Sequence, residues 1–263
     1  MNHISRHFTS KDGRIYKSHS WELREGGYRR AALLIGNGLW PASEERRLIE
    51  FLLDRGFKIV SIELAYGSAQ PPRPTLAGFR QAISAFAEET GPIGLPLYLV
   101  ASSFSASALL PVATSLPEIA ALVMLSPAAV LPPPGLKAPL FFWRTAELPV
   151  EAGQLSGTPE DLVELFKGPA SHKFRKGDLK QLAAEFAKAL KAPLDLPAAA
   201  FVGEDDPLAP ETARAALKEA GARVYAYPRV KREPPHDRYV DNFFADLGSF
   251  LDEVEASKAK ASG

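Results

Sequence analysis

The stretch LYLVASSFSASAL, residues 97–109, decides the fold that we predict for this chain. Its first half is a short apolar run, which is typical of a buried strand. Its second half is rich in alanine and serine and favours the start of a helix. Ser103 lies between the halves, and small residues, Ala101 and Ser105, stand two positions before and after it. This pattern indicates a nucleophile elbow, a sharp strand-to-helix turn around a serine. The alternative is an ordinary strand that ends in a serine N-cap.

The composition limits the class of protein to which the chain can belong. Its 263 residues are 46% hydrophobic and 24% charged, which is enough for one large α/β domain with a sizeable core. The formal net charge is zero, so we expect neither a nucleic acid nor an anionic membrane as partner. There is no cysteine, which excludes disulfides, thiolate catalysis and cysteine-based zinc sites. We find no targeting or membrane-spanning segment, and we expect a cytoplasmic protein without cofactor or metal. The oligomeric state stays open.

Apolar runs and helical spacings alternate along most of the chain. An Asp-Gly pair predicts a hairpin between residues 3–9 and 15–22. Further strands are expected at 30–35, 57–64, 97–101, 119–125, 196–202 and 223–227. Helices are expected at 43–55, at 75–90, after Ser103, and at 210–220 and 241–254. This alternation favours an α/β fold, with a mostly parallel central sheet and helices on both of its faces.

The alternation breaks after Ala128, where a segment rich in proline, phenylalanine and leucine begins. Residues 129–192 show no strand pattern, but helices are expected at 159–166 and 178–190. We therefore predict a core made of residues 1–128 and 193–263, with residues 129–192 inserted as a helical cap.

A serine nucleophile requires a base, and the base requires a carboxylate that orients it. After a nucleophile elbow, the acid and then the histidine follow the serine along the chain. Among the five histidines, only His172 and His236 follow Ser103. His172 lies in a basic stretch of the predicted cap. His236 lies between the last strand and the last helix, from where its ring can reach the carboxyl edge of the sheet. The position of His236 therefore predicts that it is the base.

The orienting acid is expected in the loop GEDDPLAP, residues 203–210, directly after an apolar strand. A carboxylate in this loop stands at the carboxyl edge, where open α/β sheets place their sites. Asp206 is the preferred acid, and Asp205 is the second choice. Glu63, at the end of an earlier strand, is a weaker alternative. Asp206 could instead only tighten the turn before Pro207.

An oxyanion hole needs two backbone N–H donors. One is expected from Phe104, directly after the nucleophile at a helix N-terminus. The other is expected from the loop GNGLW, residues 36–40, with Asn37 preferred and Leu39 possible in another register. Leu39 and Trp40 are also candidates for contacts with the substrate. The alternative for this loop is a plain strand-to-helix turn.

Together these motifs resemble those of the α/β-hydrolase superfamily, from residue 30 to residue 251. The loop at 203–210 is similar to the family's acid loop, in which the aspartate before the proline is the triad acid. His236 matches the family histidine ahead of the last helix. The elbow ASSFSA, residues 101–106, resembles that of the acyltransferase, an acyl-ACP thioesterase, of bacterial luminescence. Ile35 departs from the pattern, because many hydrolases have a histidine there.

The resemblance implies a serine hydrolase that acts on a small acyl ester or thioester. Ser103 would attack the acyl carbonyl, His236 would take and return the proton, and Asp206 would orient the imidazole. The apolar side chains in the predicted cap suggest an acyl-binding pocket, or they pack the cap onto the core. These side chains are Phe141, Phe142 and Trp143. The rivals are acyl transfer or another reaction on this fold, such as that of a peptidase, and a non-catalytic binding protein.

Overall fold

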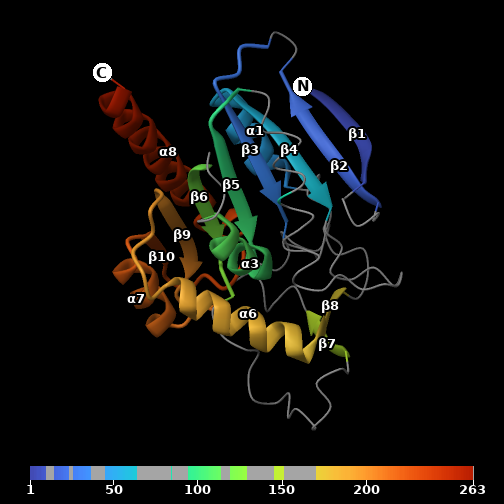
Figure 1. Cartoon of the computed structure of the whole chain (residues 1–263), viewed down its shortest axis with the longest axis vertical. Helices are drawn as coiled ribbons and strands as arrows, with labels where there is room; N and C mark the ends of the chain where they lie inside the picture. The colour runs from blue at the N-terminus through green and yellow to red at the C-terminus, as the bar shows by residue number, and fades with distance from the viewer. Residues whose placement is uncertain are drawn as a thin grey trace.

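The strands predicted from the apolar runs come together in one sheet (Figure 1). The computed structural model describes residues 1–9, 15–23, 26–36, 45–63, 84, 94–113, 119–128, 145–150 and 170–262. Within these residues, the sheet has eight strands in the order β1-β2-β4-β3-β5-β6-β9-β10. They are β1 (Asn2–Thr9), β2 (Ile15–Glu22), β3 (Arg30–Ile35), β4 (Phe57–Glu63), β5 (Leu97–Ser102), β6 (Ile119–Leu125), β9 (Ala198–Gly203) and β10 (Arg223–Tyr227).

The sheet is mostly parallel, as the alternation of strands and helices predicts. β4, β3, β5, β6, β9 and β10 each run parallel to their neighbour in this series. The expected hairpin is confirmed, because β1 pairs antiparallel with β2, and β2 pairs antiparallel with β4. The carboxyl ends of the six parallel strands therefore meet at one edge of the sheet.

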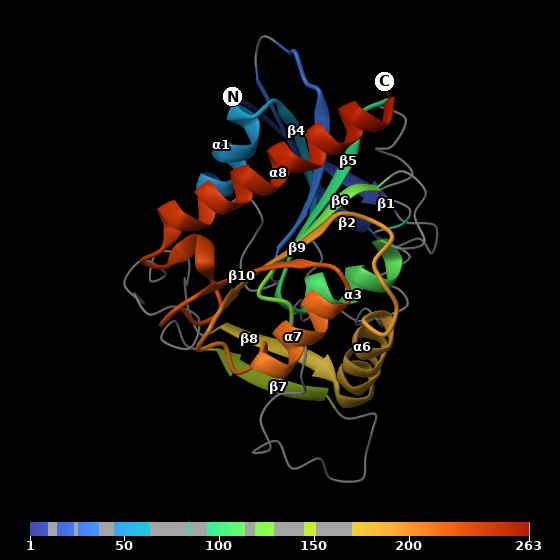
Figure 2. The same ribbon diagram turned by 90° about the vertical axis from the view of Figure 1, so that its left-hand side faces the viewer.

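Helices pack on both faces of the sheet (Figure 2). Neighbouring residues of a strand point to opposite faces, so Leu33 and Leu34 of β3 belong to two different hydrophobic clusters. The cluster of Leu34 includes side chains of α1 (Arg46–Asp54) and α8 (Val240–Ser262). The cluster of Leu33 includes side chains of α3 (Ser103–Ala113), α6 (Lys176–Ala189) and α7 (Glu211–Glu219). None of the described helices is long and apolar enough to cross a membrane.

The predicted cap differs from the expectation in one respect. β7 (Thr145–Val150) and β8 (Ala170–Arg175) pair as antiparallel strands, so the prediction that residues 129–192 contain no strand is wrong. Both strands lack an apolar run, because Glu147 and Pro149 interrupt β7 and β8 is basic. Both views place β7 and β8 beyond the carboxyl ends of the parallel strands, next to one end of α6 (Figures 1 and 2).

α6 confirms the helix expected at 178–190, and its Leu182 and Phe186 pack into the cluster of Leu33. The helix expected at 159–166 lies outside the described residues, and so does the helix expected at 75–90 apart from residue 84. The division of the chain into a core and a cap stays a prediction.

Candidate active site

Ser103 is the first residue of α3 and directly follows β5, a strand in the middle of the sheet. Its backbone φ is 57°, in the left-handed region that is strained for a residue with a side chain. Two hydroxyl groups of α3 hold the turn in place. Ser105 Oγ donates a hydrogen bond of 2.9 Å to the carbonyl of Gly36, and Ser107 Oγ donates one of 2.8 Å to the carbonyl of Ala128. The sharp turn predicted around Ser103 is thus present.

Asp206 lies in the loop after β9, at the same edge of the sheet, and is 2% exposed. Its Oδ1 accepts a hydrogen bond of 2.8 Å from the backbone N–H of Leu208. Burial raises the pKa of Asp206 to about 6, although the nearby guanidinium of Arg232 and the backbone donors lower it in part. Asp205, the alternative acid, is exposed. Asp206 is therefore the buried carboxylate of this loop, and its expected role as the orienting acid depends on where His236 lies.

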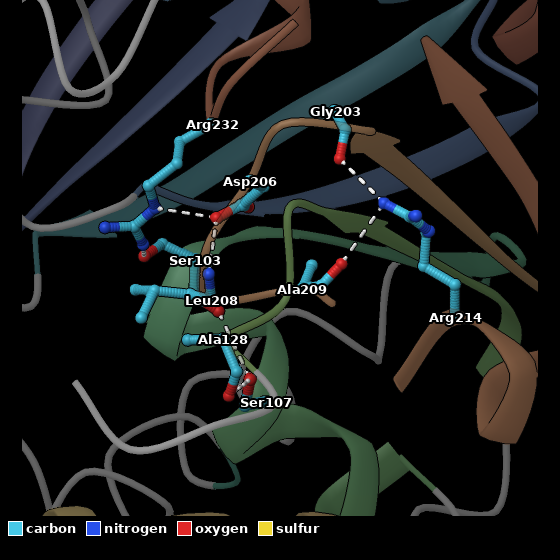
Figure 3. A network of polar contacts seen from close by, with 9 residues as sticks. All are labelled: Ser103, Ser107, Ala128, Gly203, Asp206, Leu208, Ala209, Arg214 and Arg232. Carbon is cyan, nitrogen blue, oxygen red and sulfur yellow. Dashed lines mark hydrogen bonds and ion pairs between the residues drawn. The ribbon is translucent and has the colours of Figure 1, made fainter. Parts of the chain in front are cut away.

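Arg232 lies between Ser103 and Asp206 (Figure 3). Its Nη2 donates a hydrogen bond to Ser103 Oγ, and its Nε lies 3.8 Å from Asp206 Oδ1. The guanidinium also lies over the ring of Phe104, with its carbon 5.7 Å from the ring centroid. Arg232 is 8% exposed, so this charge is almost fully buried. The structure therefore joins two of the predicted site residues through an arginine.

The raised pKa of Asp206 predicts a pH-dependent contribution to stability. The folded protein binds this proton at about pH 6, and the unfolded chain binds it near the ordinary value of 3.8. The folded state therefore binds more protons between these values. As the pH falls through this range, the group raises the free energy of unfolding by up to about 3 kcal/mol.

The measurement compares chemical unfolding of the wild type and of Asp206→Asn between about pH 8 and about pH 4. We expect the stability of the wild type to increase relative to the variant as the pH falls, because only the wild type binds the proton. A difference between the two proteins that stays constant over this range would contradict the prediction.

His236 forms no hydrogen bond with Asp206, which corrects the expected geometry. Asp206 Oδ1 bonds to the N–H of Leu208, and Asp206 Oδ2 has no hydrogen-bond partner in the described structure. His236 instead ends the short 3₁₀ helix η3 (Pro234–His236), and its Nε2 lies 2.8 Å from Oε2 of Glu45, directly before α1. The path of the loop after β10 determines the partners of these two side chains. It brings Arg232 to Asp206, and it places His236 farther along, next to α1.

The pair of Glu45 and His236 is largely buried, with side chains 2% and 13% exposed. Burial by itself lowers the pKa of His236, but the charge and the hydrogen bond of Glu45, with a smaller effect of Glu233, raise it above the ordinary value of 6.5. The pair therefore stabilises the folded protein to its full extent at pH values below the ordinary pKa of histidine. This contribution is lost as the pH rises through the raised pKa of the folded state.

Replacement of Glu45 by glutamine is expected to lower the pKa of His236 below 6.5, because burial remains and the charge is gone. NMR titration of the imidazole C–H signals measures this pKa. The variant should also lose more stability near pH 6 than near pH 8. Glu50→Gln, which changes an exposed carboxylate on α1, is the matched control. An unchanged His236 pKa in Glu45→Gln would contradict the interpretation.

Other predicted site residues fall outside the described part of the chain. These are Asn37, Leu39 and Trp40 of the loop after β3, and Phe141, Phe142 and Trp143 of the predicted cap. Phe104 is described and is the second residue of α3. Its amide therefore lies in the first turn, where helices direct N–H groups toward their N-terminus.

Arg232 and Glu45 are the site residues that sequence reasoning missed. A serine nucleophile requires a base, which arginine cannot supply, so the pattern that indicates Ser103 and His236 does not indicate the arginine of the same loop. In the sequence, Arg232 is indicated only by its position two residues after Val230, an apolar residue. Val230 follows β10 along the chain and is fully buried in the structure. The sequence also indicates a place for Glu45 near the site. Glu45 precedes a helix that follows a parallel strand, and it therefore lies at the carboxyl edge of the sheet.

The chain belongs to the α/β-hydrolase family, because residues 32–255 match the model of the Alpha/beta hydrolase family. The sheet order, the turn at Ser103 and the buried Asp206 agree with this assignment. No curated protein matches the chain.

Solved structures share its fold at low sequence identity. A soluble variant of monoglyceride lipase from Saccharomyces cerevisiae, in complex with a substrate analogue, is 18% identical with a TM-score of 0.77, over 97% of this chain and 95% of that one. Monoacylglycerol lipase from Paleococcus ferrophilus is 16% identical with a TM-score of 0.72, over 97% and 100%. The thioesterase domain from the curacin biosynthetic pathway is 16% identical with a TM-score of 0.66, over 96% and 100%.

Proposed function

We propose that this chain is a serine hydrolase that cleaves carboxylic esters or acyl thioesters through an acyl-enzyme on Ser103. The observation that carries the proposal is the left-handed φ of 57° at Ser103, on the turn between β5 and α3. A non-glycine residue keeps such a conformation where the surrounding structure imposes it, and such positions cluster at active sites. The lipases, the esterases and the thioesterase that share the fold are consistent with this chemistry.

His236 is the proposed base. It is a largely buried histidine of the loop between β10 and α8, and a carboxylate holds its ring, as the acid of a triad holds the base. The contact with Glu45 makes Glu45 the proposed orienting acid. Asp206, for which this role was expected from the sequence, instead faces Arg232.

The remaining roles follow the sequence predictions. The amide of Phe104 is proposed as one oxyanion donor and that of Asn37 as the other, with Leu39 as its alternative. The acyl group is proposed to lie against Leu39 and Trp40 and against the apolar side chains of the cap. These cap residues are Phe141, Phe142 and Trp143.

A fluorophosphonate probe tests the proposal, because it labels an activated serine covalently. We expect one label on the wild type, located at Ser103 by peptide mass spectrometry, and hydrolysis of at least one member of a panel of acyl esters and thioesters. Label on Ser102 or Ser105 would move the nucleophile to that residue. A folded wild type without label and without turnover would overturn the proposal.

The second candidate function is non-catalytic binding on the hydrolase fold. One observation favours it, namely that Arg232 lies between Ser103 and Asp206, where a triad would place its base. Arginine remains protonated in proteins and cannot take the serine proton. The fluorophosphonate experiment separates the two functions, because a binding protein of this kind would remain unlabelled while folded.

A further inference from the structure

Arg232 has more hydrogen-bond donors than the described structure uses. A guanidinium carries five N–H groups in one plane. Within the described residues, the hydrogen bond that this side chain makes is the one from Nη2 to Ser103 Oγ. Nε is buried and has no hydrogen-bond partner there, and its distance of 3.8 Å from Asp206 Oδ1 is too long for a hydrogen bond. Because buried donors are almost always satisfied, these N–H groups point to a ligand that accepts from them.

The position of this guanidinium is fixed by its surroundings. Two backbone hydrogen bonds, of 2.9 and 3.0 Å, join the loop after β10 to the acid loop. The ring of Phe104 lies against the guanidinium, with its centroid 5.7 Å from the guanidinium carbon. Arg232 is also almost fully buried, at 8% exposure. A cation that is already held beside Ser103 can receive an anion with little loss of conformational freedom.

The charges around Arg232 do not cancel. Asp206 is the carboxylate beside it, and the guanidinium of Arg214, in α7, is close enough to lower the pKa of the same carboxyl. Arg214 is held at the acid loop by hydrogen bonds of 3.1–3.4 Å to three backbone carbonyls, two of which Figure 3 shows. Two guanidinium groups thus act on one carboxylate, which leaves one positive charge in excess.

The other buried carboxylates of the described residues have cations of their own. Glu45 and Glu233 act on His236, which also lies within the influence of the guanidinium of Arg47. Asp237 lies 3.7 Å from the guanidinium of the arginine that follows it. The excess positive charge at the site is therefore available to a ligand.

A carboxylate matches both observations, because it carries a single negative charge and its two oxygens accept parallel N–H groups of a guanidinium. We infer that Arg232 is a specificity-determining residue that binds a carboxylate of the substrate, so that the site prefers an ester or thioester with this group to a neutral one. The inference rests on the proposed function, since it requires Ser103 to be the nucleophile.

The contact between Arg232 and Ser103 limits where the carboxylate stands in the substrate. Because Nη2 reaches the atom that attacks, the carboxylate must lie within a few bonds of the scissile carbonyl. It can belong to the acyl group, as in a half-ester of a dicarboxylic acid, or to the leaving group, as in an ester of a hydroxy acid.

Binding of the carboxylate also prepares Ser103 for attack. A carboxylate is a stronger acceptor than a neutral hydroxyl, so Nη2 passes from Ser103 Oγ to the substrate and frees a lone pair of Oγ. Ser103 Oγ then bonds to the acyl carbon, and its proton passes to His236, the proposed base, which gives it to the departing oxygen or sulfur. Water next attacks the acyl-enzyme and gives a proton to His236, which returns it to Ser103 Oγ as the acid departs.

The experiment measures kcat/KM for two pairs of esters, in which a carboxylate replaces a methyl ketone of similar shape. Monoethyl succinate and ethyl levulinate place the difference in the acyl group. Carboxymethyl butyrate and acetonyl butyrate place it in the leaving group. We expect the wild type to cleave the anionic ester at least about tenfold faster in one of the pairs, which is the effect of one charged hydrogen bond. The pair that shows this preference identifies the side of the substrate that carries the carboxylate.

Arg232→Gln removes the charge and keeps a polar side chain of similar reach. We expect it to lower the ratio of anionic to neutral activity at least about tenfold in the same pair. Arg232→Lys, which keeps the charge without the paired donors, should retain more of this ratio than Arg232→Gln. Arg229→Gln makes the same change of charge at an exposed position of the same loop, and as the matched control it should keep the ratio of the wild type.

Two results would overturn the inference and leave the proposed function intact. One is a wild type that is labelled at Ser103 and prefers the anionic ester by less than about tenfold in both pairs. The other is a labelled Arg232→Gln variant with the ratio of the wild type. The first result requires no variant, so the inference can be tested even if Arg232→Gln does not fold. A folded wild type without label and without turnover would instead overturn the proposed function.

Discussion

Ser103→Ala is expected to abolish fluorophosphonate labelling and to lower kcat/KM by at least about 10³-fold on any substrate that the wild type cleaves. A residue that forms the covalent intermediate has no substitute, and loss of the nucleophile alone removes most of the rate enhancement of such a site. The variant also leaves the Nη2 of Arg232 without its acceptor. We therefore expect a loss of about 1–3 kcal/mol in the free energy of unfolding, which leaves the protein folded.

Ser107→Ala is the matched control for this variant. It removes another buried hydroxyl group of α3, one that donates to the carbonyl of Ala128 (Figure 3). It should cost a similar amount of stability and retain labelling at Ser103, at a reduced rate, because the nucleophile remains although the turn loses one of the two hydroxyl groups that hold it. Turnover within about tenfold of the wild type in folded Ser103→Ala would show that another residue is the nucleophile.

Gly203→Ala is expected to destabilise the protein by about 3 kcal/mol or more, the upper end of the range for overpacked sites. Gly203 ends β9, and a Cβ on it would overlap the carbonyl oxygens of Lys231 and Val230. These are backbone atoms of the loop that carries Arg232, so the overlap can be relieved only by separating this loop from the acid loop. Thermal or urea unfolding measures the loss of stability.

Gly248→Ala, in α8, is the control for this substitution. The three atoms nearest to a Cβ at this position belong to the side chain of Arg55, which can move aside. Alanine also favours a helix over glycine by about 1 kcal/mol, so the control should be close to neutral or slightly stabilising. Equal stability of Gly203→Ala and the wild type would show that the two loops are not packed as described. Reduced labelling at Ser103 in a folded Gly203→Ala variant would connect the loop packing to the site.

The strands of the core could be predicted because their side chains are buried on both faces. β3, β5 and β9 are buried at every position, so each appears in the sequence as an apolar run, apart from Arg30 at the start of β3 and Ser102 at the end of β5. β7 and β8 could not be predicted in this way, because Pro149 interrupts one and most residues of the other are polar or basic. Their pairing joins residues 20 to 30 positions apart along the chain, from Val150↔Ala170 to Thr145↔Arg175, and no local pattern encodes it.

The candidate site likewise contains residues that could be placed from the sequence and residues that could not. Ser103 and Asp206 could be placed from the sequence, because each follows a recognisable parallel strand and the ends of such strands meet at one edge. The sequence by itself thus determined the sheet, the sharp turn and the place of Asp206 at the carboxyl edge. Only the tertiary structure decided what lies between Ser103 and Asp206. Side chains of a loop reach a site according to the path of its backbone, and that path depends on long-range packing against Gly203 and on hydrogen bonds to the acid loop. These contacts place Arg232 at the serine and His236 beside Glu45.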